Sequence, residues 1–198
     1  MNAPEWRQNV FRHRGALLAI PAIALAAFGR PTKTSIAVGV PIALGGEALR
    51  IWAVGYSGVT TRSDEVTAPA LVTAGPYAHV RNPLYVGNLV TALGFSIAFT
   101  GGQSARGRGV LTVLGLGSML AVYAAIVPLE EAYLRKTFGA AFDEYAERVP
   151  RIVPRLRAAE PASGRYDPNV ILKAESRTFL TFGAVLGVLA FKALRGAR

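Results

Sequence analysis

The chain has 198 residues, of which 52% are hydrophobic and 17% charged, and its mean hydropathy is +0.33. This composition is too apolar for an ordinary soluble domain and predicts an all-α, polytopic integral membrane protein of about five transmembrane helices. The net charge of +10 is attributed to contacts with membrane lipids, and no nucleic-acid partner is expected. The absence of cysteine excludes disulfides and thiolate sites, and two histidines are too few for a His-rich metal site.

The first predicted span covers residues 15–29, directly after a basic stretch that contains Arg7, Arg12 and Arg14. As a helix this run is about 22 Å long, so it is a short or tilted span. A basic stretch before an apolar run is also typical of a cleaved signal peptide. Gly29-Arg30-Pro31, however, is a poor cleavage site, and the later spans need a partner helix.

The second predicted span covers residues 35–56 and contains Glu47 and Arg50. Charged side chains are costly inside a membrane unless they pair or face water. A spacing of three residues brings these two side chains onto one helix face, so we expect an inward-facing ion pair. Gly58 closes this helix and is followed by a polar loop.

The third predicted span covers residues 83–99 and follows that polar, turn-forming loop. The residue before a proline is biased away from the α region, so Asn82 is expected to start the helix, with Pro83 in its first turn. Arg81 and Tyr85 would then lie at the water-facing end of an apolar helix. Such a position is suited to holding a charged cofactor beside a lipid.

The fourth predicted span covers residues 110–129, which is about the length that crosses a bilayer. Gly115 and Gly117 inside it are expected to allow close packing of a neighbouring helix. Glu130 and Glu131 follow directly after this span. Two adjacent carboxylates at this point are either the solvated end of a helix or part of a binding site.

An interfacial helix is predicted for residues 131–149, with Gly139 as a break, because apolar residues recur there at helical spacing opposite charged ones. Residues 158–175 are interpreted as a linker. Residues 176–198 are predicted to form a C-terminal apolar helix, which is long enough either to span the membrane or to lie on its surface.

The positions of Lys and Arg predict the orientation of the chain in an inner or plasma membrane. With the N-terminus inside, most of these residues fall on the cytoplasmic side. The loop before residue 83 and the pair Glu130 and Glu131 then lie on the same face. Two segments far apart in sequence would build one cytoplasmic pocket that is open both to water and to lipid.

Five short motifs follow one another along the middle of the chain. They are Leu71-Val72-Thr73-x-Gly75-x-Tyr77, Arg81-x-Pro83-x-Tyr85-x-Gly87, Glu130-Glu131, Phe138-Gly139 and Val149-Pro150. Over roughly residues 45–155 the chain therefore resembles the isoprenylcysteine carboxyl methyltransferase family. It is also similar to the wider group of membrane phospholipid methyltransferases, whose Asn-Pro-Met-Tyr motif is close to the sequence from Asn82 to Tyr85.

This resemblance implies a membrane methyltransferase core over residues 1–157 that binds S-adenosyl-L-methionine on the cytosolic side without a Rossmann domain. It also implies a lipophilic acceptor, either a lipid or a small apolar molecule, that enters between the helices. No catalytic residue and no metal ligand are assigned. The positions that match cofactor contacts of the family are Gly58, Leu71, Val72, Tyr77, Arg81, Asn82, Pro83, Tyr85, Glu130 and Glu131.

The chain departs from the family pattern at three positions. Asn82 and Pro69 each replace a histidine, and Ile126 stands where an arginine is thought to face the prenylcysteine carboxylate. An apolar residue cannot make a charge-assisted, bidentate contact with a carboxylate. Prenylcysteine is therefore expected to be a poor acceptor.

Two other classes of protein stay open on the sequence. An NADPH-dependent membrane reductase of the sterol-reductase type shares the Arg-Asn-Pro-x-Tyr element, here residues 81–85, but residues 135–139 lack its Lys-Tyr-Gly pattern. A non-enzymatic membrane scaffold or transporter component is favoured only by the apolar run near the C-terminus.

Overall fold

The computed structural model describes residues 4–58 and 68–196, and within these residues the secondary structure is helical without strands. This confirms the predicted all-α fold. The α-helices are α1 (Glu5–Phe28), α2 (Lys33–Ser57), α3 (Pro83–Thr100), α4 (Ala105–Thr112), α5 (Ser118–Phe138), α6 (Ala140–Arg148) and α7 (Val170–Gly196).

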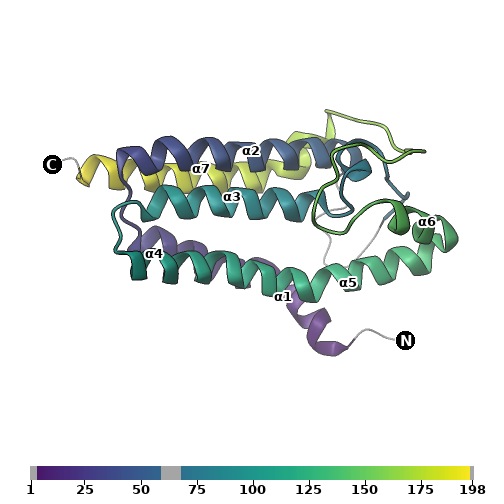
Figure 1. The fold of residues 1–198 in the computed structure, drawn as a ribbon, viewed down its shortest axis with the longest axis horizontal. Helices are drawn as coiled ribbons and strands as arrows, with labels where there is room; N and C mark the ends of the chain where they lie inside the picture. Colours follow the sequence, from purple (N-terminus) through teal and green to yellow (C-terminus); the bar gives the residue numbers. More distant parts are fainter. Residues whose placement is uncertain (1–3, 59–67, 197–198) are drawn as a thin grey trace.

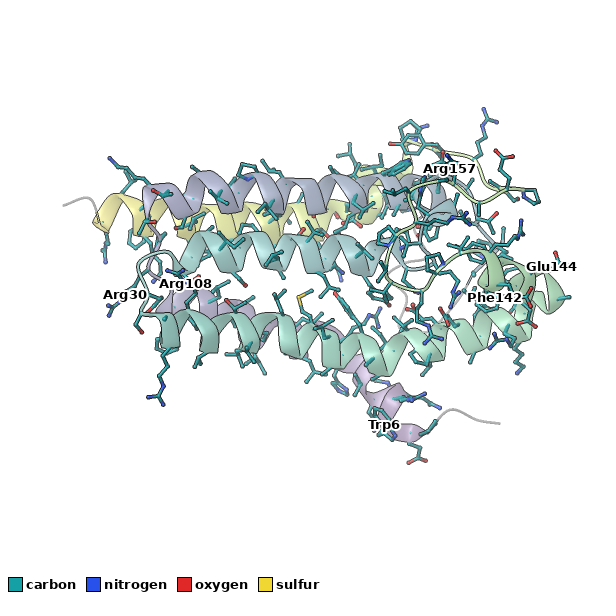
Figure 2. All side chains as sticks on the ribbon, viewed as in Figure 1. Trp6, Arg30, Arg108, Phe142, Glu144 and Arg157 are labelled. Atoms are coloured by element: carbon teal, nitrogen blue, oxygen red, sulfur yellow. The ribbon has the colours of Figure 1, made fainter. Side chains whose placement is uncertain are left out.

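Five helical stretches in the described part of the chain are long and apolar enough to cross a membrane, as predicted. They are Glu5–Phe28, Lys33–Ser57, Pro83–Thr100, Ala105–Phe138 and Val170–Arg195. These stretches follow one common axis, except for the N-terminal part of α1, which turns away from the bundle; α2, α3 and α7 lie on one side and α1, α4 and α5 on the other (Figure 1). The bundle therefore has two ends, which Arg30 and Arg108 mark on one side and Glu144 and Arg157 on the other (Figure 2).

The fourth candidate span is longer than the sequence predicted, because α4, a π-helical turn (Val113–Gly117) and α5 form one continuous run. The first half of the expected interfacial helix, residues 131–149, is thus the end of this span, and only α6 is separate. Gly139 breaks the helix as predicted, with a φ of 54° that favours glycine. The contacts at Gly115 and Gly117 are of ordinary length and do not require glycine: an added Cβ atom would lie 3.6 Å from Ser96 Oγ of α3 at Gly115 and 3.7 Å from Val113 at Gly117.

The first and last helices also begin earlier than expected. α1 begins at Glu5 rather than near residue 15, and α7 begins at Val170, inside the stretch expected to be a linker. α7 runs the length of the bundle beside α2, and its Lys192 ammonium donates to the carbonyl oxygens of Ala27 and Gly29 at the far end. α7 is therefore aligned with the other four candidate spans and is itself long and apolar enough to cross a membrane.

Glycines hold α2 and α3 in close antiparallel contact. A Cβ atom added to Gly46 would lie 2.6 Å from the Gly87 carbonyl oxygen, and one added to Gly94 would lie 2.6 Å from the Gly39 carbonyl oxygen. In both helices the two glycines are seven residues apart, so each pair meets on the same helix face. Small residues allow such close approach, which is a main source of helix association where lipid removes the hydrophobic driving force.

Gly46 and its neighbour Gly45 offer a matched test of this contact. Gly46 is buried against α3, whereas Gly45 is exposed and has nothing within 4 Å of an added Cβ. We expect Gly46→Ala to lower the free energy of unfolding by about 2 kcal/mol through overpacking. Gly45→Ala is expected to raise it by about 0.5 kcal/mol, because alanine is the better helix former. Unfolding of both variants in detergent measures the difference, and equal effects would contradict the proposed contact.

Candidate functional site

A cavity of about 660 Å³ lies at the end of the bundle where α2 ends and α3 begins. Its volume is within the range of about 300 to 1,000 Å³ that is usual for small-molecule sites. The positions that matched cofactor contacts and line this cavity are Leu71, Val72, Tyr77, Arg81, Asn82, Pro83, Tyr85, Glu130 and Glu131. Gly58 is the exception: it ends α2 with a φ of 75° beside residues 59–67, which lie outside the described part of the chain.

The segment that precedes α3 is held in place by the segment that follows α6. The Thr73 and Ala74 amides donate to the Ser163 carbonyl oxygen at 2.8 and 3.0 Å, and the Arg81 amide donates to the Pro150 carbonyl oxygen at 2.9 Å. Residues 150–163 therefore satisfy backbone groups that a loop at a cavity would otherwise leave unpaired. The sequence did not predict this role, and it assigned residues 158–163 to a linker.

Tyr77 lies in a 3₁₀ turn, Gly75–Ala78, that Gly75 begins with a φ of 61°. The Tyr145 hydroxyl of α6 donates to the Tyr77 carbonyl oxygen at 2.8 Å. Burial raises the pKa of the Tyr77 phenol to about 12, because the phenolate would lose its hydration there. Tyr77 is therefore a neutral hydrogen-bonding group at physiological pH and cannot serve as a base.

α3 starts as the sequence predicted, with Asn82 as its N-cap residue and Pro83 in its first turn. This start places Tyr85 on the cavity wall, where its hydroxyl donates to the Glu130 carboxylate at 2.7 Å. The ring of Tyr85 packs against that of Tyr123 with centroids 4.4 Å apart. Glu130 is half-buried, so one carboxylate and two aromatic rings face the same space.

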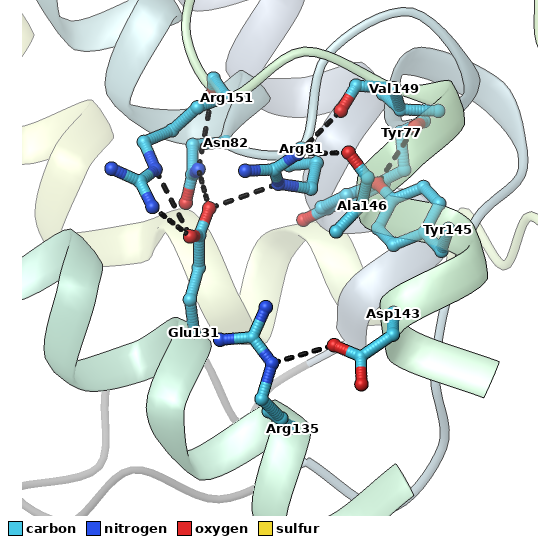
Figure 3. Close-up of polar contacts among 10 residues, drawn as sticks. All are labelled: Tyr77, Arg81, Asn82, Glu131, Arg135, Asp143, Tyr145, Ala146, Val149 and Arg151. Atoms are coloured by element: carbon cyan, nitrogen blue, oxygen red, sulfur yellow. Dashed lines mark hydrogen bonds and ion pairs between the residues drawn. The ribbon is translucent and has the colours of Figure 1, made fainter. Parts of the chain in front are cut away.

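The neighbouring carboxylate, Glu131, has a different environment, which Figure 3 shows. Arg81 donates to one of its oxygens at 3.0 Å, and Arg151 donates to the other through two nitrogens at 3.0 and 2.6 Å. Asn82 adds a weaker hydrogen bond at 3.4 Å. Glu131 thus joins α5, the start of α3 and the segment after α6.

Arg81 connects this group of ion pairs to α6 as well. Its Nη1 atom donates to the carbonyl oxygens of Ala146 and Val149 at 2.7 and 2.6 Å. Both oxygens belong to the end of α6, where no further helical donor follows. The two carboxylates therefore have different roles. Glu131 connects α5 to the start of α3 and to the segment after α6, and Glu130 faces the cavity beside Tyr85.

Deeper along α2, Arg50 also lines the cavity. Its Nη2 atom contacts both carboxylate oxygens of Glu175 at 2.9 Å, and its Nη1 atom donates to the Asn88 side chain. The Glu47 carboxylate lies 3.7 Å from Arg50 Nε, which confirms the predicted inward-facing pair. The closer partner, Glu175, was missed because it lies 125 residues away in sequence.

The contribution of the Glu131 ion pairs to stability can be tested by removing the charge of Glu131. We expect Glu131→Gln to lower the free energy of unfolding by about 3 kcal/mol, because it leaves the buried Arg81 guanidinium without its counter-charge. Asp143→Asn is the control, since it removes the exposed pair Arg135–Asp143, and such pairs contribute at most about 1 kcal/mol. Melting temperatures of the purified variants measure both effects; a Glu131 variant as stable as the control would contradict this role.

A helical bundle with five candidate spans and a cavity at one end defines an integral membrane protein with a candidate site for a small molecule. The profile of the phospholipid methyltransferase family matches residues 34–141, more than half of the chain, and the chain belongs to this family. The matched region holds α2, α3, α5 and all the predicted cofactor positions. α1 and α7 lie outside it.

Three similar proteins each align with less than half of the chain. The chain is 41% identical to the cobalt-zinc-cadmium resistance protein CzcN of Cupriavidus metallidurans over 86 residues, which are 43% of this chain and 36% of that protein. It is 37% identical to the protein-S-isoprenylcysteine O-methyltransferase of Schizosaccharomyces pombe over 86 residues, 43% of this chain and 34% of that protein. The corresponding protein B of Arabidopsis thaliana is 36% identical over 84 residues, 42% of this chain and 39% of that protein.

These alignments span little more than a third of each relative. No solved structure matches the chain. Within residues 4–58 and 68–196 there is no group of three or more His, Cys, Asp or Glu side chains that could hold a metal ion.

Proposed function

We propose that the chain transfers a methyl group from S-adenosyl-L-methionine to a lipophilic acceptor, a lipid or a small apolar molecule, at the cytoplasmic face of a membrane. The observation that carries this proposal is the pair Tyr85 and Glu130, which lies on the cavity wall and inside the family-matched region. Family membership supports the reaction type. The apolar length of the spans supports an acceptor that arrives from the lipid.

The residues on the cavity wall fit the proposed cofactor. When bound, S-adenosyl-L-methionine supplies an electrophilic methyl group on a positively charged sulfur. Glu130 offers a negative charge to such a cation, and the rings of Tyr85 and Tyr123 offer aromatic faces that attract cations. Leu71 and Val72 line the same cavity, and the family resemblance assigns backbone contacts with the cofactor to these two positions.

Methyl transfer to such an acceptor requires mainly placement and the exclusion of water. Phe11 and Leu18 of α1 and Ile126 of α5 line an apolar part of the cavity, which suits an alkyl or prenyl chain. We assign no side chain as a general base. An anionic acceptor needs none, and an amine acceptor would release its proton to water.

The role of Glu130 can be tested against that of its neighbour. We expect Glu130→Gln to weaken S-adenosyl-L-methionine binding about ten- to a hundred-fold, because one charge-assisted hydrogen bond contributes roughly 1.5 to 3 kcal/mol. Its melting temperature should stay close to that of the unmodified protein. Glu131→Gln should show the reverse, with a lower melting temperature and a smaller loss of affinity.

Calorimetric titration with S-adenosyl-L-methionine and S-adenosylhomocysteine measures these affinities. The reductase alternative is tested by the melting temperature of the protein with and without NADPH, because a ligand bound only by the folded protein must stabilise it. An affinity of the Glu130→Gln variant within twofold of the unmodified protein would remove Glu130 from the proposed site. If NADPH raises the melting temperature and the two S-adenosyl ligands do not, the reductase alternative would replace the methyltransferase proposal.

The proposed orientation predicts which residues are labelled from each side of the membrane. Glu147 lies in α6 at the cavity end, whereas Arg108 lies in α4 at the other end. The chain has no cysteine, so single variants Glu147→Cys and Arg108→Cys report one position each. In inverted and right-side-out vesicles we expect residue 147 to react from the cytoplasmic side with an impermeant maleimide, and residue 108 from the opposite side. Labelling of both from one side would overturn the proposed topology.

A further inference from the structure

The guanidinium of Arg50 is surrounded on the inner wall of the cavity. Glu175 accepts from its Nη2 atom with both carboxylate oxygens, Asn88 accepts from Nη1, and Glu47 lies near Nε. Only 12% of the Arg50 side chain is exposed, and Glu175 is fully buried. Arg50 is therefore paired with carboxylates on two sides and adds no free positive charge to the cavity.

Glu175 comes from α7, outside the region that the family profile matches. A carboxylate is costly in an apolar helix unless a cation compensates it, and Arg50 provides that compensation. A planar guanidinium binds a carboxylate best with two parallel hydrogen bonds from two of its nitrogens. On Arg50, Glu175 occupies Nη2 with both carboxylate oxygens and Asn88 occupies Nη1, so an acceptor's carboxylate finds no pair of open nitrogens there.

We propose that Glu175 is a specificity-determining positioning residue, which occupies Arg50 and so prevents the cavity from holding an acceptor by a carboxylate. This inference rests on the proposed function. It agrees with the apolar character of Ile126, which is fully buried on the opposing α5 wall. The acceptor would then be a lipophile whose reacting end carries no carboxylate.

Three further arginines line the same cavity and must be separated from Arg50 in a test. Arg81 is held by the Glu131 carboxylate and by the carbonyl oxygens of Ala146 and Val149. Arg14 donates to the Phe11 carbonyl oxygen and lies over the Phe11 ring, 4.0 Å from its centroid. Arg177 is exposed on α7. A second substitution at Arg50 identifies which cation responds when the charge of Glu175 is removed.

The probe pair is N-acetyl-S-farnesylcysteine, which carries a carboxylate, and its methyl ester, which does not. The ratio of their dissociation constants is measured for the unmodified protein, Glu175→Gln, Arg50→Gln and the double variant. We expect the unmodified protein to favour the ester or to bind both equally. Glu175→Gln should shift the ratio about tenfold or more toward the acid, the effect of one charge-assisted contact. The double variant should return the ratio to that of the unmodified protein.

Several outcomes would overturn the proposal. They are a ratio in Glu175→Gln within twofold of that in the unmodified protein, an equal shift in the double variant, or a preference of the unmodified protein for the acid. If Glu175→Gln does not fold, the Arg50→Gln variant alone tests the proposal. Its ratio of dissociation constants for the acid and the ester should equal that of the unmodified protein. A selective loss of acid binding would show that Arg50 already binds the acceptor's carboxylate in the unmodified protein, and would overturn the proposal. S-adenosyl-L-methionine binding is measured in parallel, and its absence in the unmodified protein would count against the proposed function rather than against the role of Glu175.

Discussion

The ion pairs of Glu131 with Arg81 and Arg151 join segments that are otherwise separate at the cavity end of the bundle. Each segment alone would leave a charge at the boundary of an apolar region, where desolvation is expensive. Brought together, the charges compensate one another and fix the start of α3 relative to α5 and α6. The position of Tyr85, three residues into α3, follows from this arrangement.

Adjacent residues on a helix point about 100° apart, so the two carboxylates at the end of α5 cannot share one environment. Once Glu131 is directed toward the arginines, Glu130 is turned toward the cavity and the Tyr85 hydroxyl. A single helical position thus separates a structural charge from one that faces the cavity. In the proposed function, this separation leaves Glu130 available to a cationic cofactor.

The close contact of α2 and α3 has a similar consequence deeper in the bundle. The glycines that meet at Gly46 and Gly87 place Arg50, one turn further along α2, beside Asn88 of α3. α7 then adds Glu175 to the same cluster. Packing of three helices, of which only two belong to the family-matched region, therefore decides the charge on the inner wall of the cavity.

The sequence by itself determined the helical class, the candidate spans, the start of α3 at Asn82 and Pro83, and the break at Gly139. These features depend on hydropathy, helix caps and backbone torsions, which involve only a few neighbouring residues. The tertiary structure decided that Glu131 pairs with Arg151, that residues 150–163 hold the loop before α3, and that α7 completes the cavity. A buried charge requires a partner, but which distant residue provides it depends on how the helices pack, and no local pattern encodes that choice.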